Sequence, residues 1–311
     1  MKKALVVGGT GFLGRALCGH LHLRGWRVAS LSRSLPPEYD RQDGVEYFQA
    51  DIGTISTEMA KLTLKDCSVV YNLANATVPA LSNNDITGEI HSTVESNIAL
   101  MTLCLKHEVG RYIYASSGGT VYGKAQSLPI SERHQTNPLV TYGINKLFSE
   151  KYAELFRHNF GLDYRVLRIA NPFGPGQSPF HGQGIVARYL YSALSGEEFR
   201  VFGDGTAIRD YIYVDDVSRA FESVAEYSGF ERVFNVGRGV GVSINEIVAM
   251  MDELLGINPQ IRYSEIRSTD IDQNYLDISL IKQECDWRPR YEMAPSLAKT
   301  IDWLNRRFFS G

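Results

Sequence analysis

The sequence has little of several features by which a protein's surroundings are often recognised. Only four of its 311 residues are cysteines, and Cys18, Cys67, Cys104 and Cys285 form no CxxC pair. We therefore expect no disulfide framework and no metal site, and we expect reduced cysteines in the cytoplasm. No apolar run approaches the roughly 20 residues that a membrane helix needs. The N-terminal apolar run stops at Gly8, which makes it too short for a signal peptide.

An excess of charge of either sign is also absent. Lys and Arg total 32 against 35 for Asp and Glu, a net charge of -3. This near-balance argues against nucleic acid or an anionic membrane as a partner, although a local basic pocket is compatible with it. Apolar residues make up 44% and charged residues 22%, which is ordinary for a soluble globular protein. At roughly 150 residues per domain, the length predicts two domains, or one domain with an attached lobe.

Short apolar runs alternate with helical patterns in the first half of the chain. The predicted strands are Ala4–Val7, Arg27–Leu31, Val45–Gln49, Ser68–Leu73, Tyr112–Ser116 and Tyr164–Ile169. Helices are predicted from Phe12 onward, over Thr87–His107 and over Pro138–Phe160. Because such alternation implies parallel pairing with helices on both faces, the sequence predicts an α/β fold with a doubly wound, Rossmann-type parallel sheet.

The regular alternation ends at Asn171–Gln177, a cluster of proline and glycine where the chain should leave the sheet. Beyond it the pattern is less regular, and the predicted strands and helices are Arg209–Val214, Val233–Val236, Ile244–Leu255 and Pro295–Phe308. We therefore expect one domain over residues 1–170 and mainly a smaller mixed α/β lobe over residues 171–311. Some segments of this lobe are expected to return to the sheet.

Three glycines in a GxxGxxG spacing directly follow the first predicted strand. Gly8 allows a tight turn, Gly11 allows close approach of a pyrophosphate, and Gly14 lets the helix pack on the strand. A glycine triplet alone is weak evidence, but its place between a strand and a helix strengthens it. The motif therefore predicts a dinucleotide-binding turn, with a purely structural tight turn as the alternative.

The end of the second predicted strand should lie at the ribose of the adenosine. An Asp or Glu there would accept from the 2′-OH and indicate NAD, whereas a nearby Arg suits the 2′-phosphate of NADP. The residues present are Ser32, Arg33 and Ser34, with no acid, which favours NADP. The alternative is that Arg33 lies on the surface or stacks on the adenine, and the two interpretations stay open.

Tyr142 and Lys146 share one face of a predicted helix because of their i, i+4 spacing. A tyrosine with a pKa near 10 is a poor base at neutral pH, and a lysine cation one turn away would lower that pKa. The pair alone is common by chance, but the segment Ser116–Gly123 after the fifth strand adds weight. Ligands bind at the carboxyl ends of strands in such sheets, so a hydroxyl of this segment would hold a substrate oxygen that Tyr142 deprotonates.

With these motifs in order, the chain resembles the extended short-chain dehydrogenase/reductase family, specifically its NAD(P)-dependent nucleotide-sugar epimerase/dehydratase branch. The resemblance covers nearly the whole chain and includes Gly8–Gly14, Asp51 with Ile52, Asn72–Asn75, Ser116–Gly123, Tyr142 with Lys146, Asn171–Pro175, Val201–Gly205, Arg209–Tyr211, Asn235–Gly237, Arg267 with Asp270 and Asp286–Pro289. It implies that the first domain binds the dinucleotide and that the C-terminal lobe binds a nucleotide-sugar substrate.

The resemblance also implies which residues form the site. Together with Arg33, the cofactor-binding residues would be Gly8, Gly11, Phe12, Leu13, Gly14, Asp51, Ile52, Leu73, Ala74, Tyr142 and Lys146. Asp51 and Ile52 would lie at the adenine, and Leu73 and Ala74 beside the cofactor phosphates. Tyr142 would be the base, and Lys146 would also bind the nicotinamide ribose.

On the substrate side, the implied residues are Ser117, Thr120, Asn171, Val201, Phe202, Arg209, Arg267 and Asp270. Val201 and Phe202 would border the nucleotide base. Asn171 and Arg209 would contact the diphosphate, with help from Arg267 and Asp270. Cations pair with diphosphate oxygens at close range. For an arginine taken alone, the alternative is a surface salt bridge.

The segment after the fifth strand departs from the family pattern at two glycines. Gly118 stands where a typical 4-epimerase has a third hydroxyl residue, so the catalytic hydroxyl must come from Ser117, our choice, or from Thr120. The alternative for Ser117 is a loop serine that bonds its own backbone. The dehydratase branch carries an Asp–Glu pair here, and because Gly118 and Gly119 offer no acid, dehydration is disfavoured.

These residues predict a nucleotide-sugar 4-epimerase for UDP-GlcNAc/UDP-GalNAc or UDP-Glc/UDP-Gal, with NAD as cofactor and NADP as the alternative that Arg33 leaves open. The runner-up is an NADPH-dependent reductase of a 4-keto-6-deoxy nucleotide sugar. A third hypothesis is a non-catalytic nucleotide-binding sensor, which the intact Tyr142 and Lys146 disfavour. The wall position that limits bulk at C2 of the sugar falls near Asn274. Family members are commonly dimers joined through two long helices, so we expect a homodimer.

Overall fold

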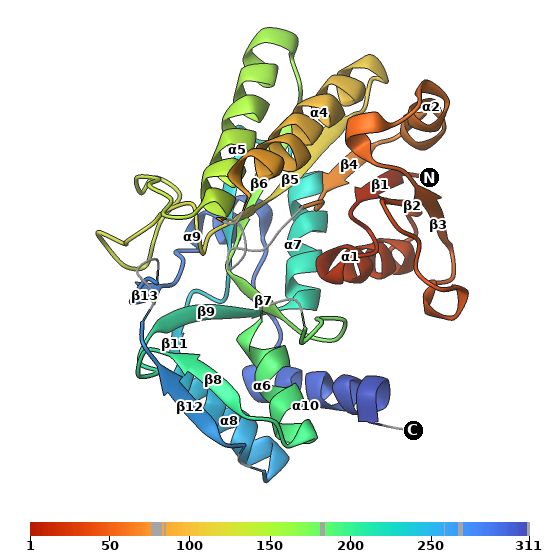
Figure 1. The fold of residues 1–311 in the computed structure, drawn as a ribbon. Coiled ribbons are helices and arrows are strands. Elements are labelled where there is room, and N and C mark those ends of the chain that lie inside the picture. The colour runs from red at the N-terminus through yellow and green to blue at the C-terminus, as the bar shows by residue number, and fades with distance from the viewer. Residues whose placement is uncertain (76–82, 84, 181–183, 258, 267–269, 310–311) are drawn as a thin grey trace.

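The fold of the computed structural model is described for residues 1–75, 83, 85–180, 184–257, 259–266 and 270–309. Its main element is a seven-stranded sheet in the order β10-β6-β5-β4-β1-β2-β3, in which every pairing is parallel (Figure 1). The strands are β1 (Lys3–Val7), β2 (Arg27–Ser32), β3 (Val45–Gln49), β4 (Val69–Asn72), β5 (Arg111–Ser117), β6 (Tyr164–Ile169) and β10 (Val233–Val236). The predicted doubly wound parallel sheet is confirmed.

Helices cover both faces of this sheet. One face carries α1 (Phe12–Leu23), α7 (Val214–Glu226) and α9 (Ser279–Cys285). The other carries α2 (Thr57–Leu64), α4 (Ser96–Lys106) and α5 (Thr141–Phe160). Side chains alternate along a strand, so Ala4 and Val6 of β1 pack into the first core and Leu5 and Val7 into the second. Burial on both faces explains why β1 reads as a continuous apolar run.

The strand order reverses between β1 and β4. From β1 the chain builds β2 and β3 on one side, then crosses back to build β4, β5 and β6 on the other. The segments that follow β1, β4 and β5 therefore leave the sheet at one edge, where ligands bind in folds of this type. This topology brings Gly8, Leu73 and Ser117 to the same cavity.

A smaller part of the molecule, below the large sheet in Figure 1, has its own core. Its strands are β7 (Asn171–Phe173), β8 (Phe199–Phe202), β9 (Ile208–Tyr213), β11 (Gly241–Ser243), β12 (Ile261–Ser264) and β13 (Gln273–Asn274). Strand β9 pairs with β7, β11 and β13, and β8 pairs with β12. The helices are α6 (Ile185–Ser195), α8 (Ile244–Leu255), α10 (Met293–Leu304) and the π-helical η4 (Asn305–Phe309). The chain returns to the large sheet at β10, beside β6.

The expected helix over Thr87–His107 is present but irregular. It consists of α3 (Ile86–Glu89), the π-helical segment η3 (Ile90–Glu95) and α4. Two short 3-10 turns, η1 (Glu38–Asp40) and η2 (Ile52–Thr54), complete the elements. Within the described ranges, no helix has the length and apolar character needed to cross a membrane.

Candidate active site

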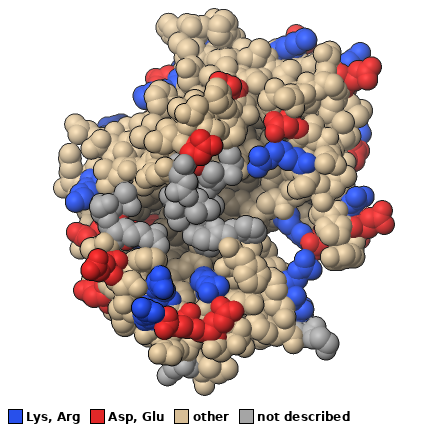
Figure 2. Space-filling view, viewed as in Figure 1, with Lys and Arg blue, Asp and Glu red and all other residues tan. Residues whose placement is uncertain are grey.

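A cavity of about 1030 Å³ opens where the edge of the large sheet faces β7, β9 and β13. A second cavity of about 780 Å³ adjoins it, and the two share Gly184, Ile185, Arg209, Ile244 and Asp270. In Figure 2 the surface is hollowed where the large-sheet part meets the smaller part. The two cavities together form one elongated cleft. A single ligand in it could contact residues of both cavities.

The glycine turn, residues 8–14, forms one wall of the first cavity. Gly8 has a φ of +81°, and a Cβ there would lie 2.8 Å from the Ala74 backbone nitrogen. A Cβ at Gly14 would lie 2.1 Å from the carbonyl oxygen of Gly8. Side chains at Gly8 and Gly14 would therefore clash with the surrounding backbone. Helix α1 begins within the turn, at Phe12. A side-chain-free turn ahead of a helix N-terminus fits the phosphates of a dinucleotide.

The residues predicted around the adenosine are not among those that line this cavity. Arg33 is exposed just after β2, where its carbonyl accepts from Gln49 Nε2 at 3.0 Å. Asp51 caps η2 by accepting from the Gly53 N–H at 2.8 Å, and Ile52 packs half-buried against the core. After β4, Leu73 and Asn75 line the cavity, whereas the predicted Ala74 is not among its lining residues. The cofactor roles of Arg33, Asp51 and Ile52 stay predictions.

Tyr142 and Lys146 project from the first turns of α5 into the same cavity as Ser117 and Thr120. The Lys146 ammonium donates to the Ala115 carbonyl at 2.8 Å. Its Nζ lies 5.5 Å from the centre of the Tyr142 ring. The structure thus brings the predicted catalytic residues together, from segments 25 residues or so apart in sequence.

The electrostatics of this pair differ from the expectation. Burial raises the pKa of Tyr142 above its usual range, and the Glu89 carboxylate acts in the same direction. Burial also lowers the pKa of Lys146 to about 7, although the Glu150 carboxylate opposes that shift. The predicted lowering of the tyrosine pKa is therefore not met in the protein alone, because burial and the Glu89 carboxylate both favour the protonated phenol.

Four polar atoms in the first cavity are buried and have no hydrogen-bond partner within the described part of the chain. They are Thr120 Oγ1, Gln177 Oε1, Tyr211 Oη and Asn274 Oδ1. Buried polar atoms are rarely left unpaired, so this set points to a ligand rich in hydroxyl or N–H groups. Sequence reasoning missed Gln177 and Tyr211. Tyr211 had a signal, since it lies two residues after Arg209 and so on the same face of β9.

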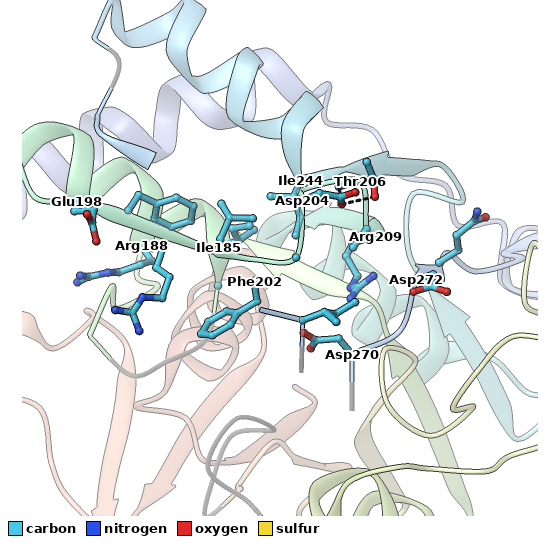
Figure 3. Close-up of a pocket in the computed structure, with 18 of the residues that line it drawn as sticks. Ile185, Arg188, Glu198, Phe202, Asp204, Thr206, Arg209, Ile244, Asp270 and Asp272 are labelled. Atoms are coloured by element: carbon cyan, nitrogen blue, oxygen red, sulfur yellow. Dashed lines mark hydrogen bonds between the residues drawn. The ribbon is translucent and has the colours of Figure 1, made fainter. Parts of the chain in front are cut away.

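The second cavity holds the residues predicted for the nucleotide end. Val201 and Phe202 of β8 line it, together with Arg209 and Asp270. Figure 3 shows the Arg209 guanidinium close to the carboxylates of Asp270 and Asp272. Burial lowers the pKa of Arg209, although Tyr211 and these two carboxylates oppose the shift.

Two further predicted residues complete this side. Asn171 lines the first cavity and donates from Nδ2 to the Asp210 carbonyl at 3.2 Å. Arg267 lies outside the described residues.

Among the residues that the structure does describe, no three His, Cys, Asp or Glu side chains gather as a metal site would require.

Comparison with known proteins gives consistent results. Residues 4–237 match the model of the "NAD dependent epimerase/dehydratase family". A UDP-glucose 4-epimerase of Mycolicibacterium smegmatis is 28% identical over 98% of this chain and 99% of its own. A dTDP-4-dehydro-6-deoxyglucose reductase of Escherichia coli is 27% identical over 96% of both chains. The crystal structure of a Thermotoga maritima UDP-glucose 4-epimerase with UDP-glucose has a TM-score of 0.92 and 30% identity, covering 98% of this chain and 99% of its own.

Proposed function

The chain belongs to the NAD dependent epimerase/dehydratase family, and from that premise we propose that it is a nucleotide-sugar 4-epimerase. The family match confirms the resemblance carried by the sequence motifs, and it confirms NAD as the cofactor. One observation carries the proposal. Ser117, Tyr142 and Lys146 line a cavity that is continuous with Arg209, so an acid–base centre and an anion anchor lie on one cleft.

The glycine turn, Leu73 and Lys146 would hold the dinucleotide. NAD held by these residues would supply a reversible hydride acceptor for C4 of the sugar and a positive charge beside the phenol. In the protein alone, burial favours the protonated phenol of Tyr142. A positive charge beside the phenol would favour the phenolate instead. The tyrosine pKa would thus fall only once the site is loaded.

Tyr142 takes the proton from the sugar O4 and later gives it back. Ser117 holds the same oxygen by a hydrogen bond, with Thr120 as the alternative, since both line the cavity. Lys146, fixed on the Ala115 carbonyl, keeps its ammonium near the phenol ring. Each of these groups acts at O4, so a 4-keto sugar forms as C4 is oxidised.

Inversion requires the sugar to turn while the rest of the molecule stays bound. Arg209 and Asn171 would hold the diphosphate, with Asp270 and Arg267, and Val201 and Phe202 would border the base. These contacts lie away from C4, so their binding energy holds the substrate without fixing the orientation of the ring. The two joined cavities supply room for both parts.

The substrate is proposed as UDP-GlcNAc/UDP-GalNAc or UDP-Glc/UDP-Gal. Asn274 forms part of the cavity wall, and its Nδ2 donates to the Gly118 carbonyl at 3.1 Å. Its Oδ1 is the unpartnered acceptor described above. A substrate donor fits this atom, either the N–H of an acetamido group or a hydroxyl.

A second candidate is an NADPH-dependent reductase of a 4-keto-6-deoxy nucleotide sugar. The similarity to the Escherichia coli reductase supports it, as does Arg33 after β2 with no acid beside it. The non-catalytic sensor finds no support, because the Tyr142 and Lys146 pair is intact and faces the cavity.

We also propose a cytoplasmic homodimer joined through α5 and the helical stretch formed by α3, η3 and α4. Apolar side chains on α5 are partly exposed, namely Ile144 at 39%, Phe148 at 52% and Leu155 at 45%. Ile86 and Ile90 in the preceding helical stretch are exposed as well. Light scattering should give twice the 34.8 kDa chain mass, and a monomer at micromolar concentration would contradict this interface.

The function is tested by incubating the protein with UDP-GlcNAc and, separately, UDP-Glc, adding only oxidised cofactor. Many turnovers to the 4-epimer without net reduction of cofactor are expected. Failure on both sugars, together with stoichiometric NADPH oxidation on a 4-keto sugar, would establish the reductase instead. Denaturing the protein and identifying the released cofactor separates NAD from NADP.

A further inference from the structure

A third residue, Glu150, continues the face of α5 that carries Tyr142 and Lys146, each one turn apart. Its carboxylate is buried against the guanidinium of Arg168 on β6, with side chains only 5% and 8% exposed. Arg168 Nη2 donates to Glu150 Oε2 at 2.7 Å, and Nε reaches both carboxylate oxygens at 3.2 Å. Neither residue lines the cavity.

This ion pair is connected to both ends of the hydroxyl loop, residues 116–123. At its start, Ser116 Oγ donates to Glu150 Oε1. Near its end, the Tyr122 hydroxyl accepts from Arg168 Nη1 at 3.0 Å and donates to Asn235 Oδ1 on β10 at 2.6 Å. All of these side chains are buried. The loop between the two attachments carries Ser117, Gly118, Gly119 and Thr120.

A buried ion pair is weak evidence of a stabilising role, because desolvation offsets much of its attraction. Positioning is the more economical explanation here. Gly118 and Gly119 have no side chains with which the loop could fix itself, and glycine has large conformational freedom. The hydroxyl loop must nevertheless present Ser117 and Thr120 to the same point as Tyr142. Attachment at both ends supplies that order.

We propose that Glu150 and Arg168 are positioning residues that clamp both ends of the hydroxyl loop and place a carboxylate one turn behind Lys146. The catalytic part of this inference rests on the proposed function, and the structural part does not. Lys146 and Glu150 together hold consecutive residues of β5, through the Ala115 carbonyl and the Ser116 hydroxyl. Helix α5 and the end of β5 therefore move as one unit.

The second effect of the clamp is that the Glu150 carboxylate stabilises the positive charge of Lys146. Tyr114 faces the ammonium from β5, with Nζ 4.8 Å from its ring centre, and Tyr142 and Glu150 face it from α5. The Glu89 carboxylate of α3 raises the pKa of Tyr142. Of these groups, Glu150 is the one that raises the pKa of Lys146 against burial. Removing its charge should let that pKa fall.

Hydrogen exchange tests the clamp without any substrate. The amides of Gly118, Thr120 and Val121 donate within the loop or to β6, at 2.8, 3.2 and 3.1 Å, so their exchange reports loop opening. In Ser116→Ala and in Tyr122→Phe, which leave the ion pair intact, these amides should exchange at least about fivefold faster. Exchange equal to wild type in both variants would overturn the clamp, whatever reaction the protein catalyses.

The charge effect is tested by the pH profile of Glu150→Gln. The loss of kcat at high pH should begin about one pH unit lower than in wild type, because a nearby opposite charge raises the pKa of a lysine by about that amount. KM should change less than twofold. Glu150→Asp should restore part of the profile. Asp163→Asn is the matched control, since Asp163 pairs with Arg111 and Arg165 at the far end of the sheet.

The charge effect would be contradicted if kcat of Glu150→Gln fell at the same high pH as in wild type. It would also be contradicted if the shift were no larger than in Asp163→Asn. If wild type turns over no nucleotide sugar, the proposed function fails. The exchange measurement on Ser116→Ala and Tyr122→Phe still decides the clamp in that case.

Discussion

The glycine turn and the hydroxyl loop occupy equivalent positions but are held in different ways. Each follows a parallel strand of one sheet, β1 and β5, and each lines the same cavity. The turn is held mainly by its backbone, through the positive φ of Gly8 and the close approach of Gly14 to Gly8, with further bonds from Gly8 and Thr10 to β2. The loop has backbone bonds as well, and in addition several side chains from other elements hold it.

These outside contacts come from four segments. Glu150 of α5 and Arg168 of β6 hold the ends of the hydroxyl loop, Asn235 of β10 holds Tyr122, and Asn274 of β13 donates to the Gly118 carbonyl. The comparison teaches that binding and chemistry are built separately here. In our proposal, local backbone geometry shapes the cavity that takes the phosphates, whereas long-range polar contacts position the hydroxyls of Ser117 and Thr120. Variants on the two sides should therefore fail differently.

The largest effect is expected at the tyrosine that faces the loop. Tyr142→Phe removes the only atom that exchanges a proton with O4 in our proposal, so turnover should fall about 10³-fold or more. The fold should remain, because the ring keeps its packing. Turnover is measured with the better of the two UDP-sugars, and folding by circular dichroism. Tyr152→Phe, on the same helix, is the control, and near-normal activity of Tyr142→Phe would remove the assignment.

Gly14→Ala should break the turn. The new Cβ would meet the Gly8 carbonyl at 2.1 Å, between backbone atoms that have little room to move. Overpacking of this kind costs about 1–3 kcal/mol of unfolding free energy. The variant should also bind NAD more weakly, measured by calorimetry. Gly19→Ala on the same helix is the control, since its Cβ would meet only the flexible end of the Gln42 side chain. Unchanged cofactor affinity in Gly14→Ala would mean that the turn does not hold the phosphates.

Asn274→Asp tests one long-range contact of the loop. Aspartate keeps the shape but loses the donor to the Gly118 carbonyl and places a carboxylate against it. We expect kcat/KM to fall about tenfold, the scale of one hydrogen bond plus an unpaired acceptor. The affinity for NAD should not change, because the glycine turn is untouched. Equal loss of cofactor binding would contradict the separation of the two regions.

The smallest effect concerns the pH dependence of stability. The pKa of Lys146 is about 7 in the folded protein, against 10.5 as the ordinary value. Between pH 7 and 9 the unfolded chain therefore holds a proton that the folded protein has released, so this group makes stability rise with pH. In Lys146→Met that contribution disappears, and the unfolding free energy should rise less steeply over the same range. Parallel curves for both proteins would show that the lysine keeps its ordinary pKa.

The comparison also explains what the sequence could predict. Elements with strong local signals were predicted well, such as Val45–Gln49, Tyr164–Ile169 and Ile244–Leu255, whose bounds agree with the structure. Strands β7, β8, β11, β12 and β13 were not predicted as such. They are short, and their pairing with β9 and with each other is set by the tertiary structure.

The site follows the same rule. The sequence predicts the glycine turn and the pair of Tyr142 and Lys146, because residue spacing alone places them on a turn and on one face of a helix. Glu150 and Arg168 carried no such signal, since their contact joins α5 to β6. The pKa of Tyr142 was misjudged for a related reason. Spacing shows the neighbouring lysine, but it does not show the burial of the phenol or the nearby Glu89 carboxylate, which both raise the tyrosine pKa.

The most direct test of the central claim uses a UDP-sugar that carries deuterium at C4. Our account predicts that the purified protein, with NAD only, forms the 4-epimer over many turnovers and that the deuterium stays at C4 in the product. Nuclear magnetic resonance of the product would show both. Exchange of the deuterium for solvent hydrogen, or reaction only with stoichiometric reduced cofactor, would contradict a 4-epimerase that acts through Tyr142.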